Sequence, residues 1–442
     1  MSHEQKQRWH VAAPWLVFAV ALLAQFPLAL NPGYFSHDEL QWAVRAGMTH
    51  PVAWLGVDAF QYRPLTFNLW MWLSRHLFAQ PQAFHTVIVA WGAANAALLF
   101  ALGRKFGVGA WPAAFGALLF ALGPFAAYTH GWVGTIADLA WLSAALLIGL
   151  HLLRRPATMS AIAVTALLTG LGLLAKEAAF AIPALLAVAW WFSGRKRIWA
   201  VAAVSAGTVA AVYLAVRAGV LLHVPREGTQ YTLSLAHVPL RWLEYQLFAP
   251  IPTVFETFNT LSRGMNSRIV IAALLWLALL AALWRSDKRL PWLFLAGGFA
   301  ALLPVLPLGS SWNHYGYGFA AVTAMIVAAA WRPASRWARV MIALMALLTL
   351  WHGVNVTRQM RAVGAVQAVF SPALADVLRD RATRDPLRLR PSADAAGWMF
   401  RRLTHNIPSY AGIPIGDRVH MVAPDQPADL IIQADGRLRA PP

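Results

Sequence analysis

Cysteine is absent from this chain, and charged side chains are scarce. With no Cys among 442 residues, disulfide bonds and thiolate metal sites are excluded. Asp, Glu, Lys and Arg make up 12% of the residues, well below the roughly 25% that soluble domains carry. A P-loop, a dinucleotide-binding glycine fingerprint and a His-Glu-x-x-His zinc helix are also missing. The chain is therefore not an ordinary soluble domain, and it has none of these three motifs.

Hydrophobic residues, by contrast, make up 59% of the chain and fall into long runs. A membrane-spanning helix needs about 20 apolar residues, because hydrocarbon offers its backbone no outside hydrogen-bond partner. About eleven segments qualify. They are residues 11–30, 82–103, 109–128, 132–153, 158–174, 178–193, 198–220, 268–284, 290–308, 314–331 and 338–356. The predicted fold is an all-α polytopic membrane protein whose first segment is retained as a helix, because no cleavage site follows it.

The chain has a net charge of +18, and many of its Lys and Arg residues lie in short clusters between the apolar segments. The clusters are Lys6/Arg8, Arg104/Lys105, Arg154/Arg155, Arg195/Lys196/Arg197, Arg285/Lys288/Arg289 and Arg332/Arg336/Arg339. They follow every second segment boundary, so the positive-inside rule places the N-terminus in the cytoplasm and the other loops outside. We expect the protein in a plasma membrane, the inner membrane of a bacterium. Because the clusters form no basic soluble face, the expected partners are membrane lipids and not nucleic acid.

The composition changes near residue 357, where long apolar runs end. This change predicts a transmembrane domain over residues 1–356 and a small extracytoplasmic region over residues 357–442. Within the second region, "RVHMVA" and "DLIIQADGRLRA" predict short strands, the latter a pair that turns at Asp435-Gly436.

Two long outer loops are predicted, at residues 31–81 and 221–267. The first contains "LTFNLWMWLSRHLF", a composition that is typical of helices lying in the membrane interface. The second is interrupted by prolines at 225, 239, 250 and 252 and has the length of a lid.

The first outer loop carries Ser36-His37-Asp38-Glu39. Two adjacent carboxylates at a membrane surface can supply a general base, since a neighbouring like charge and partial burial raise a carboxyl pKa. Asp38 and Glu39 are therefore the catalytic candidates. The alternative is purely local: Ser36 or Asp38 can cap a helix that runs through "ELQWAVRAG".

Arg63, Lys176 and Glu177 are candidate substrate-binding residues. The planar fork of Arg63, in "YRPL", suits two phosphate oxygens, although an Arg in the interface can also be a simple anchor. Lys176 and Glu177 interrupt the apolar run "LLTGLGLLAKEAAFAIPALL", where ionisable groups are costly unless they are paired or wet. Sequence neighbours on a helix do not face each other, so each needs another partner. The alternative is a polar turn between two spans.

Four further candidates fall at the same outer level: His130, Asp138, His314 and Tyr315. Asp138 can pair with Lys176 or with an Arg, either as a structural ion pair or in support of a site. For His314 the alternative is an ordinary hydrogen-bonded interfacial histidine. Each residue alone is a weak indication, but all of these polar sets lie on the outer side. They predict one cavity with convergent polar groups.

Five elements occur in a fixed order along residues 30–330: Asp38-Glu39, "YRPLTFNLWMWLSRHLFAQPQAFHTVIVAWGAANAALLFALGRKFG", "THGWVGTIADLAW", "LLAKEAAFAIPALL" and "WNHYGYGFAA". In this order the chain resembles the GT-C superfamily of membrane glycosyltransferases. Within that superfamily it is most similar to the membrane portion of the transmembrane and tetratricopeptide-repeat O-mannosyltransferases and their bacterial relatives.

The resemblance implies a GT-C-like helical bundle with an outer-face active site and a polyprenyl-phosphate-linked sugar as donor. By position it implies that Asp38 lies near the reacting centre with Glu39 beside it, and that Arg63 and Lys176 meet the donor phosphate. The residues that would shape the site are Glu177, Asp138 and His130. Some relatives use a divalent metal ion, which Asp38 or Glu39 would hold, but we expect no dedicated metal cage. The family's repeats do not follow, so a glycan, lipid or protein acceptor is left open.

The predicted reaction is an inverting glycosyl transfer in which Asp38 takes the proton of the acceptor hydroxyl. One alternative is a transporter or flippase for lipid-linked sugars, in which the same charges guide a polar head group. Another is a catalytically inactive scaffold of the same fold. The chain has no evident internal repeat of the kind that transporters carry, which favours catalysis.

Overall fold

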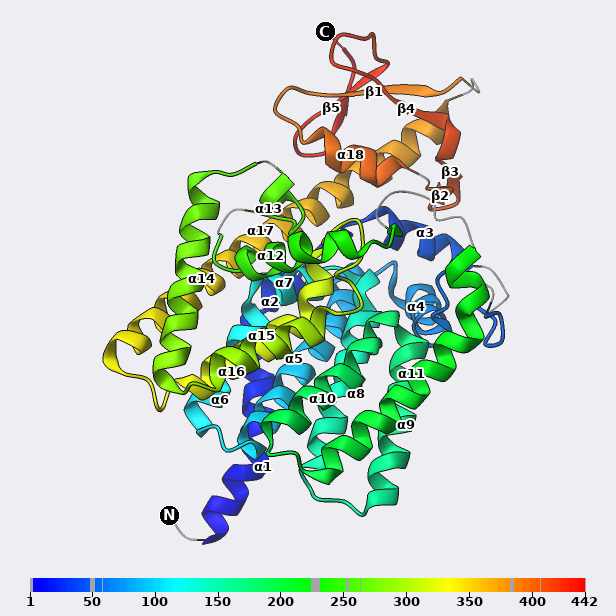
Figure 1. Ribbon diagram of the computed structural model, residues 1–442. Coiled ribbons are helices and arrows are strands. Elements are labelled where there is room, and N and C mark those ends of the chain that lie inside the picture. Colours follow the sequence, from blue (N-terminus) through cyan, green and yellow to red (C-terminus); the bar gives the residue numbers. More distant parts are fainter. Residues whose placement is uncertain are drawn as a thin grey trace.

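The computed structural model describes residues 3–47, 52–57, 59–223, 231–251, 254–262, 264–381, 385–405 and 407–441, with side chains from residue 12 onwards except at residues 222, 223, 259 and 262. They form a bundle of apolar helices with a small sheet at one end (Figure 1). The α-helices of the bundle are α1 (His3–Ala24), α2 (Phe26–Ala29), α3 (His37–Ala46), α4 (Pro64–Leu77), α5 (Pro81–Lys105), α6 (Ala110–Leu122), α7 (Pro124–Gly131), α8 (Ile136–Leu152), α9 (Thr158–Ala175), α10 (Ala181–Phe192), α11 (Arg197–His223), α12 (Val238–Phe248), α13 (Asn259–Ser262), α14 (Ser267–Ser286), α15 (Leu290–Leu302), α16 (Tyr317–Ala330) and α17 (Arg336–Asp380). Short 3-10 helices connect them at η1 (Val133–Thr135), η2 (Glu177–Phe180), η4 (Leu235–His237) and η5 (Asn313–Gly316).

Among the described residues, six helices are long and apolar enough to cross a membrane, or seven if the bent pair α6 and α7 is one span. The six are Pro81–Lys105, Val133–Leu152, Thr158–Ala175, Arg197–Leu221, Ser267–Ser286 and Arg336–Asp380. Three other predicted spans coincide with shorter apolar helices, Ala12–Ala24, Glu177–Phe192 and Leu290–Leu302. The predicted span 314–331 coincides with the 14-residue helix α16. The helical architecture fits a multi-pass membrane protein, whereas the count of eleven spans stays a prediction.

Proline and glycine determine where several helices begin and break. Helices α4, α5 and α7 each start at a proline, which has no N–H to leave unpaired in the first turn. At Gly123 and Pro124 the chain bends by 54° between α6 and α7. The backbone is extended at Trp132, before α8, and at Lys176, between α9 and α10. Non-helical backbone at membrane depth is tolerated where it borders a cavity, so these breaks indicate where a site can lie.

Both predicted outer loops contain short helices. Helices α3 and α4 lie within residues 31–81, and α12 and α13 lie within residues 221–267. Their position relative to a membrane surface stays a prediction. Residues 48–51, 58, 224–230, 252, 253 and 263 of these loops, with Pro225 and Pro252 among them, lie outside the described residues.

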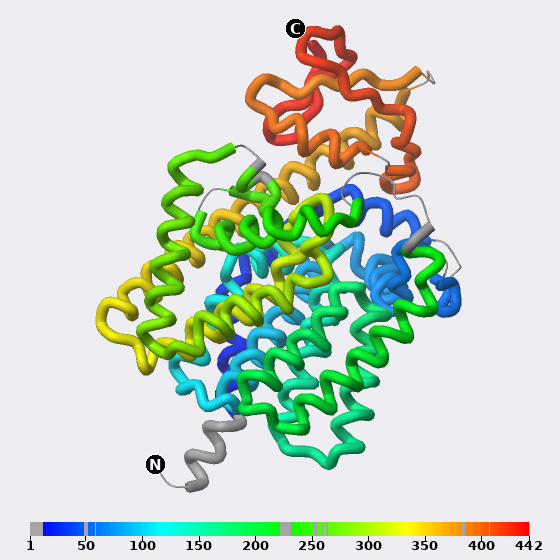
Figure 2. The backbone as a smooth tube through the Cα atoms, viewed as in Figure 1, coloured from blue at the N-terminus to red at the C-terminus, as the bar shows by residue number. Residues whose placement is uncertain are grey.

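Helix α17 continues for 45 residues from Arg336 to Asp380, so the predicted boundary at residue 357 falls inside one helix. Figure 2 shows it as a continuous tube from beside α16 to the C-terminal sheet. Near the far end, Gln367 accepts a hydrogen bond from the Tyr34 N–H at 2.8 Å. A Cβ at Gly364 would lie 1.9 Å from Asn31 Oδ1, so glycine is required there. Helix α17 thus supports the chain that leads into α3.

The C-terminal region forms a four-stranded sheet in the order β4-β1-β5-β6. The elements of the C-terminal region are β1 (Leu387–Pro391), α18 (Gly397–Thr404), β2 (Ser409–Tyr410), β3 (Ile413–Pro414), η6 (Gly416–Arg418), β4 (Val419–Met421), β5 (Leu430–Ile432) and β6 (Leu438–Arg439). The predicted strands are confirmed as β4, β5 and β6, with Gly436 at φ +90° in the turn between the last two. The Phe400 ring of α18 packs on Phe370 of α17 at 5.0 Å, which attaches the sheet to the bundle.

The connections from α8 to α9 and from α10 to α11 lie at the end of the bundle away from the C-terminal sheet (Figure 1). They carry the clusters Arg154/Arg155 and Arg195/Lys196/Arg197. This separation is what the positive-inside prediction requires. The orientation across a membrane stays a prediction.

Candidate active site

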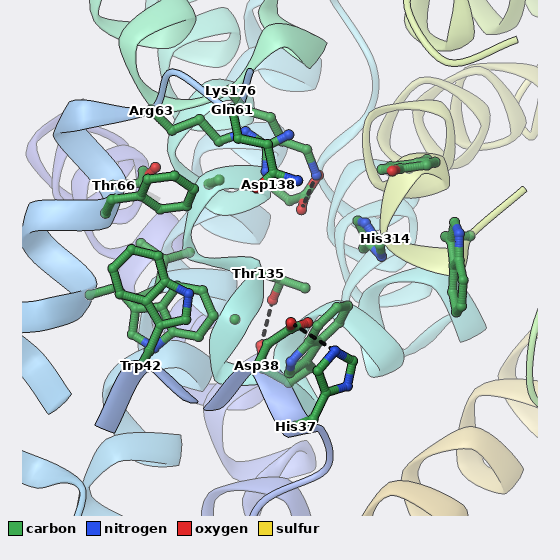
Figure 3. A pocket seen from close by; sticks show the side chains of 18 of the residues that line it. His37, Asp38, Trp42, Gln61, Arg63, Thr66, Thr135, Asp138, Lys176 and His314 are labelled. Carbon is green, nitrogen blue, oxygen red and sulfur yellow. Dashed lines mark hydrogen bonds and ion pairs between the residues drawn. The ribbon is translucent and has the colours of Figure 1, made fainter. Parts of the chain in front are cut away.

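One cavity of about 190 Å³ lies where α3, α4, the helix breaks and α18 meet. Six of the nine predicted site residues line it: Asp38, Arg63, Asp138, Lys176, His314 and Tyr315. The other three, Glu39, His130 and Glu177, are not among its lining residues. In Figure 3, His37 and Asp38 lie across the cavity from Lys176 and Asp138. The structure therefore brings together residues from distant parts of the chain and leaves space between the two charged sides.

Asp38 enters the cavity from the first turn of α3. Ser36 caps this helix in a capping box with Glu39, so the cap that the sequence offered as an alternative is present. The Asp38 side chain is 36% exposed and lies 3.3 Å from His37 Nε2. Burial lowers the pKa of His37, while Asp38 opposes this shift. An accessible carboxylate beside an imidazole can accept a proton from a ligand.

Glu39, by contrast, is a structural residue. Its side chain is buried and accepts hydrogen bonds from the backbone N–H groups of Phe35, Ser36 and Val133 at 2.6, 2.7 and 3.0 Å. These contacts tie the start of α3 to η1. The prediction of Glu39 as a second catalytic carboxylate has no geometric support, because its oxygens face the backbone and not the cavity.

Lys176 and Asp138 form a buried ion pair. Lys176 Nζ donates to the Asp138 carboxylate oxygens at 2.7 and 2.6 Å, and the side chains are 5% and 2% exposed. The predicted pairing of these two residues is confirmed. Lys176 also lies 4.9 Å from the centre of the Tyr315 ring. The extended backbone at Lys176 and the start of α8 bring both charges to the cavity wall.

Arg63 pairs with Glu177, the residue that follows Lys176 in the sequence. Arg63 Nε donates to Glu177 Oε2 at 2.8 Å, and Arg217 Nη1 lies 3.7 Å from Glu177 Oε1. Glu177 is thus a partner behind the cavity. Arg217 also donates to the carbonyls of Ala59 and Phe60 at 2.6 and 2.9 Å, which fixes the segment leading to Arg63.

His130 and His314 have different surroundings. His130 is fully buried and contacts Gln25 and, at 2.8 Å, the Tyr317 hydroxyl, so it belongs to a polar network in the bundle. His314 lines the cavity with its ring edge against Trp132, 5.2 Å between ring centres. Burial, together with the cations Lys176, Arg63 and Arg402, holds the pKa of His314 well below its ordinary value. His314 is therefore a neutral imidazole at neutral pH.

Arg402, on α18, is a cavity residue that the sequence did not indicate. Its guanidinium donates to Ser36 Oγ and Glu256 Oε1, both at 3.3 Å, and lies 4.3 Å from the Phe35 ring centre. The C-terminal region thus adds a third cation to the cavity, next to the cap of the helix that bears Asp38. With 12 Arg after residue 357, no local pattern separates Arg402 from the others.

Aromatic side chains form much of the remaining wall, which sequence reasoning also missed. They are Trp42, Phe67, Trp70, Trp132, Tyr231 and Trp312. The chain contains 22 Trp, and most of them are expected at membrane interfaces or in packing. The sequence therefore does not distinguish the few Trp residues that line the cavity from the others.

The donor set does not fit a dedicated metal site. No three His, Asp or Glu side chains in the described part of the chain are grouped so that they could hold a metal ion. Glu39 is committed to backbone N–H groups, and Asp138 is committed to Lys176. The Arg and Lys side chains that line this cavity are Arg63, Lys176 and Arg402.

Comparisons of the chain with protein-family models and with curated proteins found no match.

Proposed function

We propose that this protein is a membrane glycosyltransferase that moves a sugar from a polyprenyl-phosphate donor to an acceptor hydroxyl. One observation carries the proposal: an accessible carboxylate, Asp38, shares a cavity with three cations, Arg63, Lys176 and Arg402. The cavity lies among the breaks of an apolar helical bundle. A lipid-linked donor reaches such a place through the membrane, without a soluble nucleotide.

The reaction is a single displacement at the anomeric carbon. Asp38 accepts the proton of the acceptor hydroxyl, whose oxygen forms the new bond to the anomeric carbon. The bond from that carbon to the phosphate oxygen breaks, and polyprenyl phosphate leaves with the electron pair. The configuration inverts, and the sugar carbon has oxocarbenium character in the transition state.

Arg63 and Lys176 stabilise the leaving phosphate. Arg63 and Lys176 each have a carboxylate partner, Glu177 and Asp138, and Arg402 has Glu256. Each cation is therefore held in place before the substrate arrives, which avoids reorganisation during the reaction. Because Asp38 lies on the other side of the cavity from Lys176 (Figure 3), the acceptor and the leaving group can approach the sugar from opposite faces, as inversion requires.

The first prediction tests Asp38 as the general base. Asp38→Asn should reduce transfer by at least about 100-fold, since general-base catalysis contributes roughly 10²–10⁴. Transfer is measured with the purified protein, radiolabelled polyprenyl-phosphate sugars and candidate glycan, lipid and peptide acceptors. Asp376→Asn is the matched control, because Asp376 is exposed on α17 and pairs only with Arg379 among the described residues.

Two outcomes contradict the proposal. Transfer at full rate by Asp38→Asn removes Asp38 as the base. Movement of lipid-linked sugar across vesicle membranes by the wild type, without transfer to any acceptor, indicates a flippase instead.

A further inference from the structure

Positive charge is concentrated at the end of the bundle away from the C-terminal sheet, where three helix connections meet. These are the connections from α5 to α6, from α10 to α11 and from α16 to α17. The Phe106 ring stacks on Trp199 at 6.0 Å between ring centres, which joins the first two. Arg332 of the third lies against Gly109 of the first, since a Cβ at Gly109 would lie 2.4 Å from Arg332 Nε. Together the three contain eight Lys or Arg and no Asp or Glu, over residues 104–111, 193–199 and 331–339.

Three of these cations are brought together by backbone contacts. Arg104 Nη1 donates to the Val108 carbonyl at 2.7 Å, and the Arg332 side chain lies against Gly109, the next residue. Arg339 Nη2 donates to the Arg332 carbonyl at 3.2 Å. We call Arg104, Arg332 and Arg339 the arginine cluster. Its three positive charges therefore lie at the same two connections.

The arginine cluster lacks a protein counter-charge. None of the carboxylates in the described part of the chain forms a salt bridge with Arg104, Arg332 or Arg339. Like charges that are held together repel each other unless an anion joins them. Arg332 and Arg339 are exposed, and a guanidinium presents its N–H donors in a planar fork that matches two phosphate oxygens. The cluster thus offers an accessible surface for a phosphate group.

Exposed apolar side chains lie at the same two connections. Trp111, in the first turn of α6, is 87% exposed, and Trp331 and Trp337 beside the arginines are also exposed. Further along α17, Val340 and Leu347 are 64% and 65% exposed. A soluble anion would leave these side chains in water. A lipid covers them, because Trp is favoured at the level of the headgroups and aliphatic side chains are favoured along the acyl chains.

The charge balance selects the class of lipid. A zwitterionic headgroup carries an ammonium group as well as a phosphate, and the three connections contain no Asp or Glu to pair with it. An anionic headgroup needs no such partner. Basic pockets between membrane helices are known to hold anionic headgroups.

We infer that the arginine cluster is a binding site for the phosphate of an anionic phospholipid, whose acyl chains lie along the exposed apolar face of α17. The inference is independent of the proposed function, because none of the three arginines lines the cavity.

The sharpest variant displaces Arg332 without changing the charge of the protein. Gly109→Ala puts a methyl group where the guanidinium lies. The backbone at Gly109, with φ −56° and ψ 154°, accepts an alanine, so the flexible Arg332 side chain moves and the fold is kept. A second variant, Arg332→Gln with Arg339→Gln, removes two of the charges.

Each variant has a matched control. Arg154→Gln with Arg155→Gln removes two exposed charges from the connection between α8 and α9, at the same end of the bundle (Figure 1). Gly207→Ala adds a methyl group where nothing lies within 4 Å. The purified full chain in non-ionic detergent is titrated with phosphatidylglycerol, phosphatidylcholine and the soluble glycerol phosphate. Native mass spectrometry measures binding, and thermal unfolding without added lipid establishes that each variant is folded.

The wild type should bind phosphatidylglycerol at least about tenfold more tightly than phosphatidylcholine. Both cluster variants should lose about tenfold in affinity for phosphatidylglycerol, the effect of losing a hydrogen bond to a charged group. Both controls should bind it as the wild type does. If the double glutamine variant does not fold, Gly109→Ala decides.

Four results would overturn the site. They are equal affinity of the wild type for the two lipids, unchanged phosphatidylglycerol affinity in folded Gly109→Ala, an equal loss in Arg154→Gln with Arg155→Gln, and binding of glycerol phosphate as tight as that of phosphatidylglycerol. The third would reduce the effect to the overall charge of this end, and the fourth would indicate a soluble anion.

Discussion

Asp38 and Glu39 are adjacent in sequence, yet their surroundings differ. The Glu39 oxygens meet three backbone N–H groups, whereas the Asp38 carboxylate faces the cavity beside His37. Burial raises the pKa of Glu39 to about 8, although the backbone hydrogen bonds oppose this shift. The sequence offered a helix cap and a catalytic acid as alternatives, and the structure assigns the cap to Ser36 and Glu39. One turn of helix thus holds a structural carboxyl and an accessible one.

The second prediction concerns His314 and pH. The folded protein keeps His314 neutral, because burial and the cations Lys176, Arg63 and Arg402 lower its pKa. The unfolded chain binds a proton at this residue below its ordinary value of 6.5, so stability falls as pH decreases from there. The contribution of His314 to the free energy of unfolding falls by up to about 1.4 kcal/mol for each pH unit below that value.

His314→Asn should therefore flatten the pH dependence. Thermal unfolding in detergent between pH 7.5 and pH 5 measures the slope for both proteins. An identical slope in the variant would mean that His314 takes up its proton in the folded state.

At the scale of helices, the site depends on interruptions. Lys176 lies at the extended break between α9 and α10, and its partner Asp138 lies in the first turn of α8 after another break. Apolar runs predicted the helices, and the interrupted run predicted that Lys176 needs a distant partner. The bend at Gly123 and the capping of α3 determine how the helix ends that carry the site residues come together. The sequence could not predict this arrangement, because tertiary packing produces no periodic pattern of apolar residues.

The third prediction separates the structural role of the Lys176–Asp138 pair from its chemical role. Asp138→Asn should destabilise the protein by about 3–5 kcal/mol, because it leaves a buried ammonium without a counter-charge. The double change Lys176→Met with Asp138→Leu should recover most of that stability, since no charge is then buried.

Transfer activity should stay lost in the double variant, because the cation for the leaving phosphate is gone. Unfolding in detergent and the transfer assay measure the two effects. Full activity in a stable double variant would make the pair purely structural.

The fourth prediction concerns the packing of α17 against the bend between α6 and α7. A Cβ at Gly353 would lie 1.8 Å from the Leu122 carbonyl oxygen, so Gly353→Ala forces the helices apart. The expected loss is about 1–3 kcal/mol or more, the usual cost of overpacking. Gly207→Ala on α11 is the control, since nothing lies within 4 Å of a Cβ there. Unfolding temperatures compare the two variants, and equal values would contradict the tight contact.

At the scale of the whole molecule, the C-terminal region is part of the cavity. Arg402 comes from α18 and donates to Ser36 at the start of α3, 366 positions earlier in the chain. The sequence predicted the C-terminal strands from alternating apolar residues and turn residues. It could not predict this docking, because Arg401 and Arg402 are equivalent in the sequence. The packing of Phe400 against Phe370 determines which of the two faces the cavity.

The fifth prediction tests Arg402 as a contact to the substrate. Arg402→Ala should lower kcat/KM for the lipid donor by about 10- to 100-fold, the effect of losing a hydrogen bond to a charged group. Arg401→Ala is the matched control, because Arg401 is exposed on the same helix. Arg402→Lys should restore part of the activity. Equal kcat/KM in the two alanine variants would limit Arg402 to holding Glu256.

The length of α17 has a mechanical consequence. At 45 residues the helix is a rod of roughly 67 Å, and it contains both a candidate span and the attachment point of the sheet that bears Arg402. Tilting such a rod by about 5° displaces its tip by about 6 Å, more than the reach of a hydrogen bond. Helix tilt adjusts to lipid thickness, so the choice of lipid or detergent belongs among the variables of any assay of this protein.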